Sequence, residues 1–155
     1  MPNLRRAFER AAPRFVAAAW DFADRAPAVD HLWVYVTHER DINVIIAYYR
    51  VGGAVHSAAD LAEALPGIDW SDEAQHRLLD RLYAILDDVL AAAGDGRFPT
   101  RMVLSMDTAT QQVNAEFSYS PLQPGVPYDQ NVADVTLADQ WLQRLRTTGN
   151  DSATL

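Results

Sequence analysis

The chain of 155 residues contains no cysteine and no lysine. The absence of cysteine excludes disulfides, thiolate metal sites and a cysteine nucleophile, and it is usual in cytosolic proteins. No segment approaches the roughly 18 consecutive apolar residues that a membrane helix requires. The apolar stretch near the N-terminus is interrupted by Asp21 and preceded by arginines, so it does not fit a signal peptide. These absences predict a soluble, cytoplasmic protein without a membrane segment.

Positive charge is scarce and unevenly distributed. The formal net charge is -8, and arginine supplies all of the positive side chains. Between Asp60 and Asp95, nine acidic residues stand against only Arg77 and Arg81. Such a surface repels nucleic acid and speeds encounters with basic partners, although acidic residues also serve solubility alone. The charge therefore argues against nucleic acid as a partner and leaves a basic protein partner and simple solubility both open.

Alternating apolar residues predict two pairs of strands. The first pair covers 31–37 and 42–51 with the polar turn "HERD" between them, and the second covers 101–107 and 112–119. Trp33 and Tyr35 share one side of the first strand, and Tyr49 lies in the equally apolar second strand. We expect these three aromatic side chains to lie on a partly exposed face of a sheet.

Helices are predicted over 3–25, 72–93 and 133–146, where apolar residues recur three and four apart. Ser71 is a suitable N-cap for the second helix, and Pro13 is expected to kink or split the first. These elements predict an α+β fold with two layers, in which two hairpins build an antiparallel sheet and the helices pack on one face. The single domain is expected to cover 1–147, followed by a disordered tail over 148–155.

No catalytic or cofactor motif is assembled in the sequence, which lacks a nucleophile elbow, a phosphate-binding loop and a dinucleotide fingerprint. Asp107 and Glu116 could form an acid–base pair, but alternation places both on the solvent side of their hairpin, where charges also discourage aggregation. Four histidines are present, none at the spacing of metal ligands: His31, His38, His56 and His76. We therefore expect no catalytic residue, no metal and no cofactor.

The stretch "FPTRMVLSMDTATQQVNAEFSYSPL", from Phe98 to Leu122, resembles the second half of the YezG-like immunity proteins. That family has an apolar strand ending in Ser-Leu-Asp, a turn, and a second strand that closes in aromatic residues. The positions that match here are Thr100, Leu104, Ser105, Met106, Asp107, Phe117 and Tyr119. The helix "RLLDRLYAILDDVLAAAG" and the hairpin "LWVYVTHERDINVIIAYYRVGG" are similar to earlier parts of the family, so the resemblance covers about residues 15–122.

The resemblance implies a cytosolic antitoxin without enzymatic activity, which binds and neutralises the toxic domain of a secreted polymorphic toxin, often a nuclease. An acidic surface would suit a basic toxin domain of this kind. The residues expected to contact the toxin are three aromatic anchors and four carboxylates: Trp33, Tyr35, Tyr49, Asp87, Asp88, Asp107 and Glu116.

Two other interpretations stay open on the sequence. One is a small ligand-binding or enzymatic domain with a pocket between sheet and helices, using His31 or His38. The other is a homodimeric adaptor that pairs through an open sheet. A deep polar pocket containing two or more histidines would favour the first of these.

Overall fold

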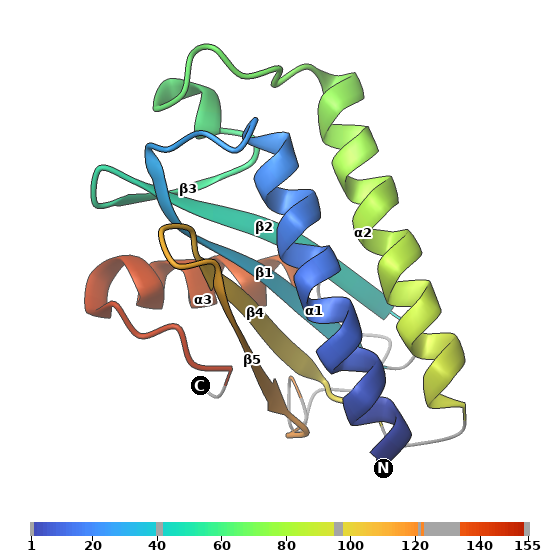
Figure 1. Cartoon of the computed structure of the whole chain (residues 1–155). Coiled ribbons are helices and arrows are strands. Elements are labelled where there is room, and N and C mark those ends of the chain that lie inside the picture. The colour runs from blue at the N-terminus through green and yellow to red at the C-terminus, as the bar shows by residue number, and fades with distance from the viewer. Residues whose placement is uncertain (1, 40–41, 95–97, 121, 123–133, 154–155) are drawn as a thin grey trace.

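The computed structural model of the protein describes residues 2–39, 42–94, 98–120, 122 and 134–153. A five-stranded antiparallel sheet lies at the centre, with two long helices on one face and a third helix on the other (Figure 1). The strands are β1 (Val29–Glu39), β2 (Ile42–Val51), β3 (Ala54–Ser57), β4 (Arg101–Asp107) and β5 (Gln112–Ser118). The helices are α1 (Pro2–Phe22), α2 (Asp72–Ala93) and α3 (Asp134–Thr148), and a short 3₁₀ turn covers Leu61–Glu63. The predicted α+β class with an antiparallel sheet is confirmed.

The strand order β3-β2-β1-β4-β5 places β1 at the middle of the sheet. β1 pairs antiparallel with β2 on one side and with β4 on the other, so the two predicted hairpins share one continuous sheet. The tight turn from β2 to β3 uses Gly52 and Gly53, which have φ values of 59° and 81°. Glycine is suited to this turn because positive φ costs it little.

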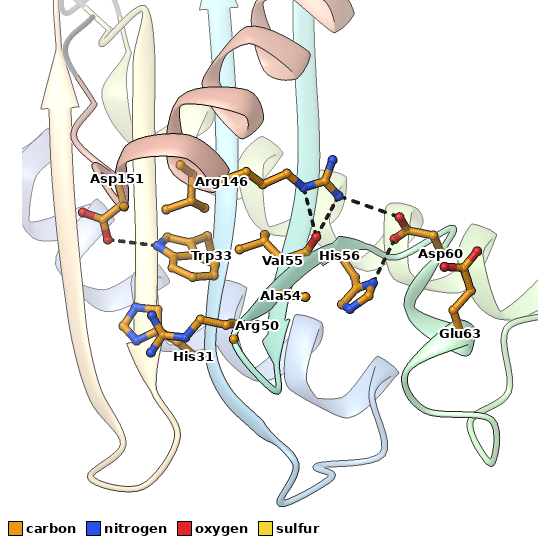
Figure 2. Close-up of a pocket in the computed structure, with 13 residues that line it drawn as sticks. His31, Trp33, Arg50, Ala54, Val55, His56, Asp60, Glu63, Arg146 and Asp151 are labelled. Carbon is orange, nitrogen blue, oxygen red and sulfur yellow. Dashed lines mark hydrogen bonds and ion pairs between the residues drawn. The ribbon is translucent and has the colours of Figure 1, made fainter.

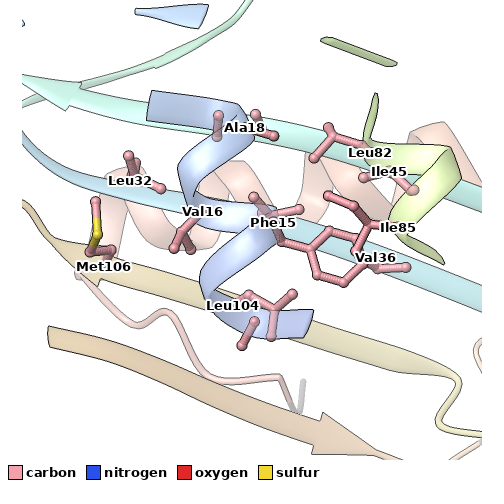
Figure 3. Close-up of a cluster of buried hydrophobic side chains, with 14 of the residues drawn as sticks. Phe15, Val16, Ala18, Leu32, Val36, Ile45, Leu82, Ile85, Leu104 and Met106 are labelled. Carbon is pink, nitrogen blue, oxygen red and sulfur yellow. The ribbon is translucent and has the colours of Figure 1, made fainter. Parts of the chain in front are cut away.

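The main core lies between the sheet and the pair α1 and α2 (Figure 3). Alternation along the strands sends Leu32, Val34 and Val36 of β1 toward this side, where each is fully buried. The apolar stripes of the two helices meet them, with Phe15 and Leu82 also fully buried. The β4–β5 hairpin contributes Met102, Leu104, Met106 and Phe117 to this core, as alternation predicts. The other side of β4 was expected to face solvent, but Arg101, Val103 and Ser105 are buried there.

Pro13 does not split α1, which runs as one helix from Pro2 to Phe22. The prediction of a split was wrong because Pro13 lies on the exposed side of the helix, next to exposed Arg14. Proline has no N–H to donate to the carbonyl of Glu9, four residues earlier, and Glu9 is also exposed, where water can reach the backbone. In α2 the predicted cap is confirmed, since the Ser71 hydroxyl accepts a 3.2 Å hydrogen bond from the backbone N–H of Ala74.

The second face of the sheet is covered rather than open. α3 packs across it and buries Ala138, Trp141, Leu142 and Leu145 in a second, smaller core. We expected all helices on one face. The correction has a physical cause: α1 and α2 fill that face, so the apolar side of α3 can be buried only on the opposite one. None of the described helices is long and apolar enough to cross a membrane.

The segment after α3 also differs from the disordered tail predicted over 148–155. Asp151 accepts a 3.0 Å hydrogen bond from the indole Nε1 of Trp33, and the carbonyl of Ser152 accepts one of 3.0 Å from Nε1 of Trp141. Ala153 is buried in the second core. Two buried indole N–H groups need acceptors, and this segment supplies them. Residues 154–155 lie outside the described part of the chain.

We expect Asp151→Ala to lower the free energy of unfolding by about 1–3 kcal/mol, because it leaves the buried Trp33 indole N–H without an acceptor. Asp151→Asn is the matched control, since its amide oxygen can still accept the bond. Urea denaturation of the three proteins measures the difference. Equal stability of all three would show that the segment is not held as described.

Candidate functional site

The aromatic side chains expected to contact a partner are all buried. Trp33 and Tyr35 lie under α3, where the Tyr35 and Trp141 ring centroids are 5.2 Å apart. Tyr49 lies on the opposite face and donates a 2.7 Å hydrogen bond to the carbonyl of Ala19 in α1. Burial raises the pKa of the Tyr49 hydroxyl well above its ordinary value, so this group stays protonated and is structural.

Register explains why these three side chains do not share one exposed face. Trp33 pairs with Tyr48 across β1 and β2, whereas Tyr49 pairs with Leu32 and therefore points toward the main core. Alternation within each strand was predicted correctly, but alternation does not fix which residues of two strands lie opposite each other. In this conformation the three aromatic side chains are core residues and cannot contact a partner.

Asp107 and Glu116 are not brought together. Both point to the α3 side, but Asp107 pairs with Gln112 and Glu116 pairs with Val103, four residues along β4, which is roughly 13 Å at the usual strand rise. The Asp107 carboxylate accepts bonds from the backbone N–H groups of Ala109 and Thr110 and so caps the hairpin turn. They form no acid–base pair, and each has a structural contact of its own.

Glu116 is tied to the segment that follows α3. Its carboxylate accepts a 2.8 Å hydrogen bond from the backbone N–H of Ala153, which holds the segment against the β4–β5 hairpin. Glu116 is otherwise exposed, so it remains accessible to a partner. Its main visible role is to anchor this segment.

Asp87 and Asp88 differ in their surroundings, although both are exposed on α2. Asp88 forms a 3.1 Å ion pair with Arg14 of α1. Asp87 points outward, in line with Asp80 and Glu73 at intervals of seven residues, so the three carboxylates follow one side of the helix about 10 Å apart. None of the three has a basic partner within ion-pair distance among the described residues. We call Glu73, Asp80 and Asp87 the acidic stripe.

An exposed tryptophan lies beside one end of the acidic stripe. Trp70 is 55% exposed and stands two residues before α2 begins, and its carbonyl accepts a 2.9 Å hydrogen bond from the side chain of Gln75. We did not predict Trp70 as a contact residue. The sequence could have indicated it, since Trp70 lies in the polar loop "PGIDWSD", outside any apolar pattern. A tryptophan that has no predicted place in the core is a candidate contact residue.

A pocket of about 600 Å³ opens on the α3 side of the sheet, beside the turn from β2 to β3 (Figure 2). It is lined by His31 and Trp33 of β1, Arg50 of β2, His56 of β3, Asp60 and Glu63 near the 3₁₀ turn, and Leu145, Arg146 and Asp151. Its volume is within the range typical of small-molecule sites. A pocket between sheet and helices that uses His31 or His38 was one of the open interpretations. This pocket contains His31, but its grouping with His56 was not predicted, because it depends on the position of α3.

Most charged groups of this pocket are engaged with the protein itself. Arg146 donates from Nε and Nη2 to the carbonyl of Val55 at 3.1 and 2.7 Å, and its Nη2 lies 3.9 Å from Asp60. Asp60 also accepts a 3.1 Å bond from the hydroxyl of Ser57 and lies 3.9 Å from Nδ1 of His56. These contacts fix one wall of the pocket, as the dashed lines of Figure 2 show.

The other wall is formed by His31 and Arg50. Burial lowers the pKa of His31 below its ordinary value, and the positive charge of Arg50 lowers it further. Three nearby carboxylates have the opposite but smaller effect. The imidazole is therefore neutral at pH 7. Its Nε2 atom is buried and has no hydrogen-bond partner among the described residues. The arrangement provides binding groups but no activated nucleophile.

His38 lies outside this pocket, at the far end of β1. Its Nδ1 atom is hydrogen-bonded to the side chain of Asn43, and its ring packs edge-on against Phe98 with centroids 4.7 Å apart. Asp41, which is close to His38 in the sequence, lies outside the described residues. Within the part of the chain that the structure describes, no three His, Asp or Glu side chains gather closely enough to hold a metal ion.

Comparison with known proteins adds no assignment to these features. A scan against protein-family models finds none that matches the chain, and a search of curated proteins finds no relative. The interpretation of the site therefore rests on the chemistry of its own residues.

Proposed function

We propose that this protein is an immunity protein that binds and neutralises a basic toxin domain, and that the outer face of α2 with Trp70 is the docking surface. The observation that carries the proposal is the acidic stripe, whose carboxylates have no basic partner among the described residues, with an exposed tryptophan at its end. The resemblance of residues 15–122 to YezG-like immunity proteins supports the same function.

The chemistry of this surface suits rapid recognition of a positively charged protein. Carboxylates at regular intervals along a rigid helix attract a basic surface from a distance and speed association. A tryptophan supplies the large, rigid contact area that dominates many interfaces. The protein would act in the cytoplasm, without catalysis of its own, by occupying the toxin. A nuclease is the toxin class that best fits, since a cleft that binds nucleic acid is basic.

A test needs the toxin that this chain is paired with. If the neighbouring gene encodes a large protein with a toxic domain at its C-terminus, that domain is the candidate. If that domain and this chain are co-expressed, we expect them to co-purify as a stoichiometric complex. Separate elution of the two on size exclusion, at micromolar concentration, would overturn the proposal.

Neutralising the acidic stripe is expected to slow association with the toxin domain. We expect the double variant Asp80→Asn and Asp87→Asn to associate about threefold to tenfold more slowly at low ionic strength. The difference should shrink as salt is added, since screening weakens attraction between exposed charges. Stopped-flow mixing measures the rate.

The control is the double variant Asp24→Asn and Asp139→Asn. It changes the net charge by the same amount at exposed positions away from the outer face of α2. If both double variants slow association equally, only the total charge matters and the acidic stripe is not the docking surface. If the association rate of the wild-type protein does not depend on salt, electrostatic attraction does not speed the encounter, and that part of the proposal is wrong.

The alternative of a ligand-binding domain is favoured by one specific observation, the pocket that contains both His31 and His56. Binding in that pocket does not compete with docking on α2, because the acidic stripe lies on the helical layer at the opposite face of the sheet (Figure 1).

A further inference from the structure

We propose that the pocket between β1, β2, β3 and α3 binds a small oxyanion, a carboxylate or phosphate group, between the guanidinium of Arg50 and the imidazole of His31. This site is independent of the toxin-binding surface proposed for α2. Its ligand is identified only by the group that these two side chains recognise.

Arg50 has donors left to bind a ligand. Its Nε donates a 2.9 Å hydrogen bond to the carboxylate of Asp30, with which it forms an ion pair. The side chain of Arg50 is 41% exposed and that of Asp30 is 56% exposed. Neither terminal nitrogen of this guanidinium donates to a described residue. A guanidinium offers five N–H donors in a planar fork, so the two Nη atoms can engage the two oxygens of a carboxylate or phosphate.

His31 lies directly beside Arg50, as its paired residue across β1 and β2. The ring of Trp33 backs both groups, since it lies 4.6 Å from the His31 ring and 5.9 Å from the Arg50 guanidinium carbon. The buried Nε2 of His31 lacks a partner among the described residues, which is unusual for a polar atom at such a position. An oxyanion bound by Arg50 would lie beside this imidazole, so that its negative charge acts on the ring.

The carboxylates of the pocket do not block an anion. Asp60 is held by Ser57 and Arg146 on the opposite wall, and Asp151 accepts the indole hydrogen of Trp33. Glu63 is exposed and lies beyond Asp60, on the far side of the pocket from Arg50 in Figure 2. The Arg50 side of the pocket is therefore where a negative group is best accommodated.

Proton uptake should accompany binding. The groups that face His31 are Arg50 of β2, Asp30 of β1, Asp107 of β4 and Asp151 after α3, and their balance together with burial keeps its pKa low. A bound anion adds a negative charge beside the ring and raises the pKa of His31. Binding should therefore tighten as the pH falls. Acetate is the suitable probe for this effect, because it stays mostly ionised between pH 7.5 and 5.5, whereas phosphate changes its charge within this range.

The experiment titrates the isolated protein with sodium phosphate and, separately, with sodium acetate, and follows the ring proton resonances of His31 by NMR. At least one of the two anions is expected to shift His31 in a saturable manner. Arg50→Gln should weaken that binding roughly tenfold, as expected for loss of a charge-assisted contact. Arg77→Gln, an exposed arginine of α2, should leave it unchanged.

With acetate, affinity should rise by about threefold to tenfold between pH 7.5 and 5.5, and this dependence should disappear in His31→Asn. Saturation by phosphate alone or by acetate alone supports the site and identifies the preferred oxyanion. No saturable shift with either anion at concentrations up to tens of millimolar overturns the proposal. So does equal binding by wild type and Arg50→Gln, provided that urea denaturation shows the variant to be folded.

Discussion

Replacing Trp141 with alanine is expected to lower the free energy of unfolding by about 3–5 kcal/mol, the range for removal of a large buried aromatic side chain. Trp141 is fully buried between α3 and the sheet. Its ring centroid lies 5.2 Å from that of Tyr35 and 5.6 Å from that of Tyr48, and its indole N–H donates to Ser152. The substitution therefore opens a cavity and removes one of the two donors to the Ser152 carbonyl, which also accepts a hydrogen bond from Arg144.

Trp70→Ala is the matched control for this prediction, because it deletes the same side chain from an exposed loop. Its effect on stability is expected to stay within about 0.5 kcal/mol, as for most surface substitutions. Urea denaturation measures both variants against the wild type. If Trp141→Ala is as stable as Trp70→Ala, α3 does not pack on the sheet. The second face would then be open, as the sequence predicted.

The same Trp70→Ala variant is expected to have the largest single effect on toxin binding. We expect a loss of about 2 kcal/mol of binding free energy, close to thirtyfold in the dissociation constant, because exposed tryptophans at interfaces are frequent hot spots. Most of the loss should appear as faster dissociation. Trp70→Phe should recover part of the affinity, since it restores an aromatic surface of smaller area.

Surface plasmon resonance with the immobilised toxin domain measures both rates. Gln143→Ala, at an exposed position of α3, is a control for loss of an exposed side chain outside the proposed docking surface. Unchanged affinity of Trp70→Ala would exclude the start of α2 from the interface. In that case a complex that still forms would have to use another surface, and Glu116 and the β4–β5 hairpin would be examined next.

Local features of the fold could be predicted from the sequence because each depends on neighbours in the chain. The Ser71 cap is determined by a hydroxyl three residues before Ala74, and the inner side of the β4–β5 hairpin by alternation from Met102 to Met106. The β1–β2 hairpin followed from the polar turn "HERD" between two apolar segments. In these cases the local pattern and the tertiary structure favour the same conformation.

Features that depend on distant residues could not be predicted. The position of α3 is decided by which sheet face α1 and α2 leave uncovered, and this choice decides whether Trp33 and Tyr35 are surface or core. The segment after α3 is held in place by two hydrogen bonds from indole N–H groups. Trp33 donates to Asp151, 118 residues away, and Trp141 donates to Ser152, 11 residues away. The 600 Å³ pocket exists only because α3 and this segment form its wall.

The candidate site shows the same division. Exposure of Asp87 on the outer side of α2 follows from helical periodicity, and the charge of the 60–95 region was visible in the sequence. The ion pair that engages Asp88 depends on Arg14, 74 residues earlier, and so required the packing of α1 against α2. The pairing of His31 with Arg50 required the register of β1 and β2.

The proposal that this chain is an immunity protein is tested most directly by cell growth. Growth is measured after induction of the candidate toxin domain, with and without co-expression of this chain. We predict that cells expressing the toxin domain alone stop growing and that co-expression of the wild-type chain restores growth. Rescue should weaken when Trp70→Ala is combined with Asp80→Asn and Asp87→Asn, at equal protein level. Failure of the wild-type chain to rescue growth, although it is present as a folded protein, would contradict its assignment as an immunity protein.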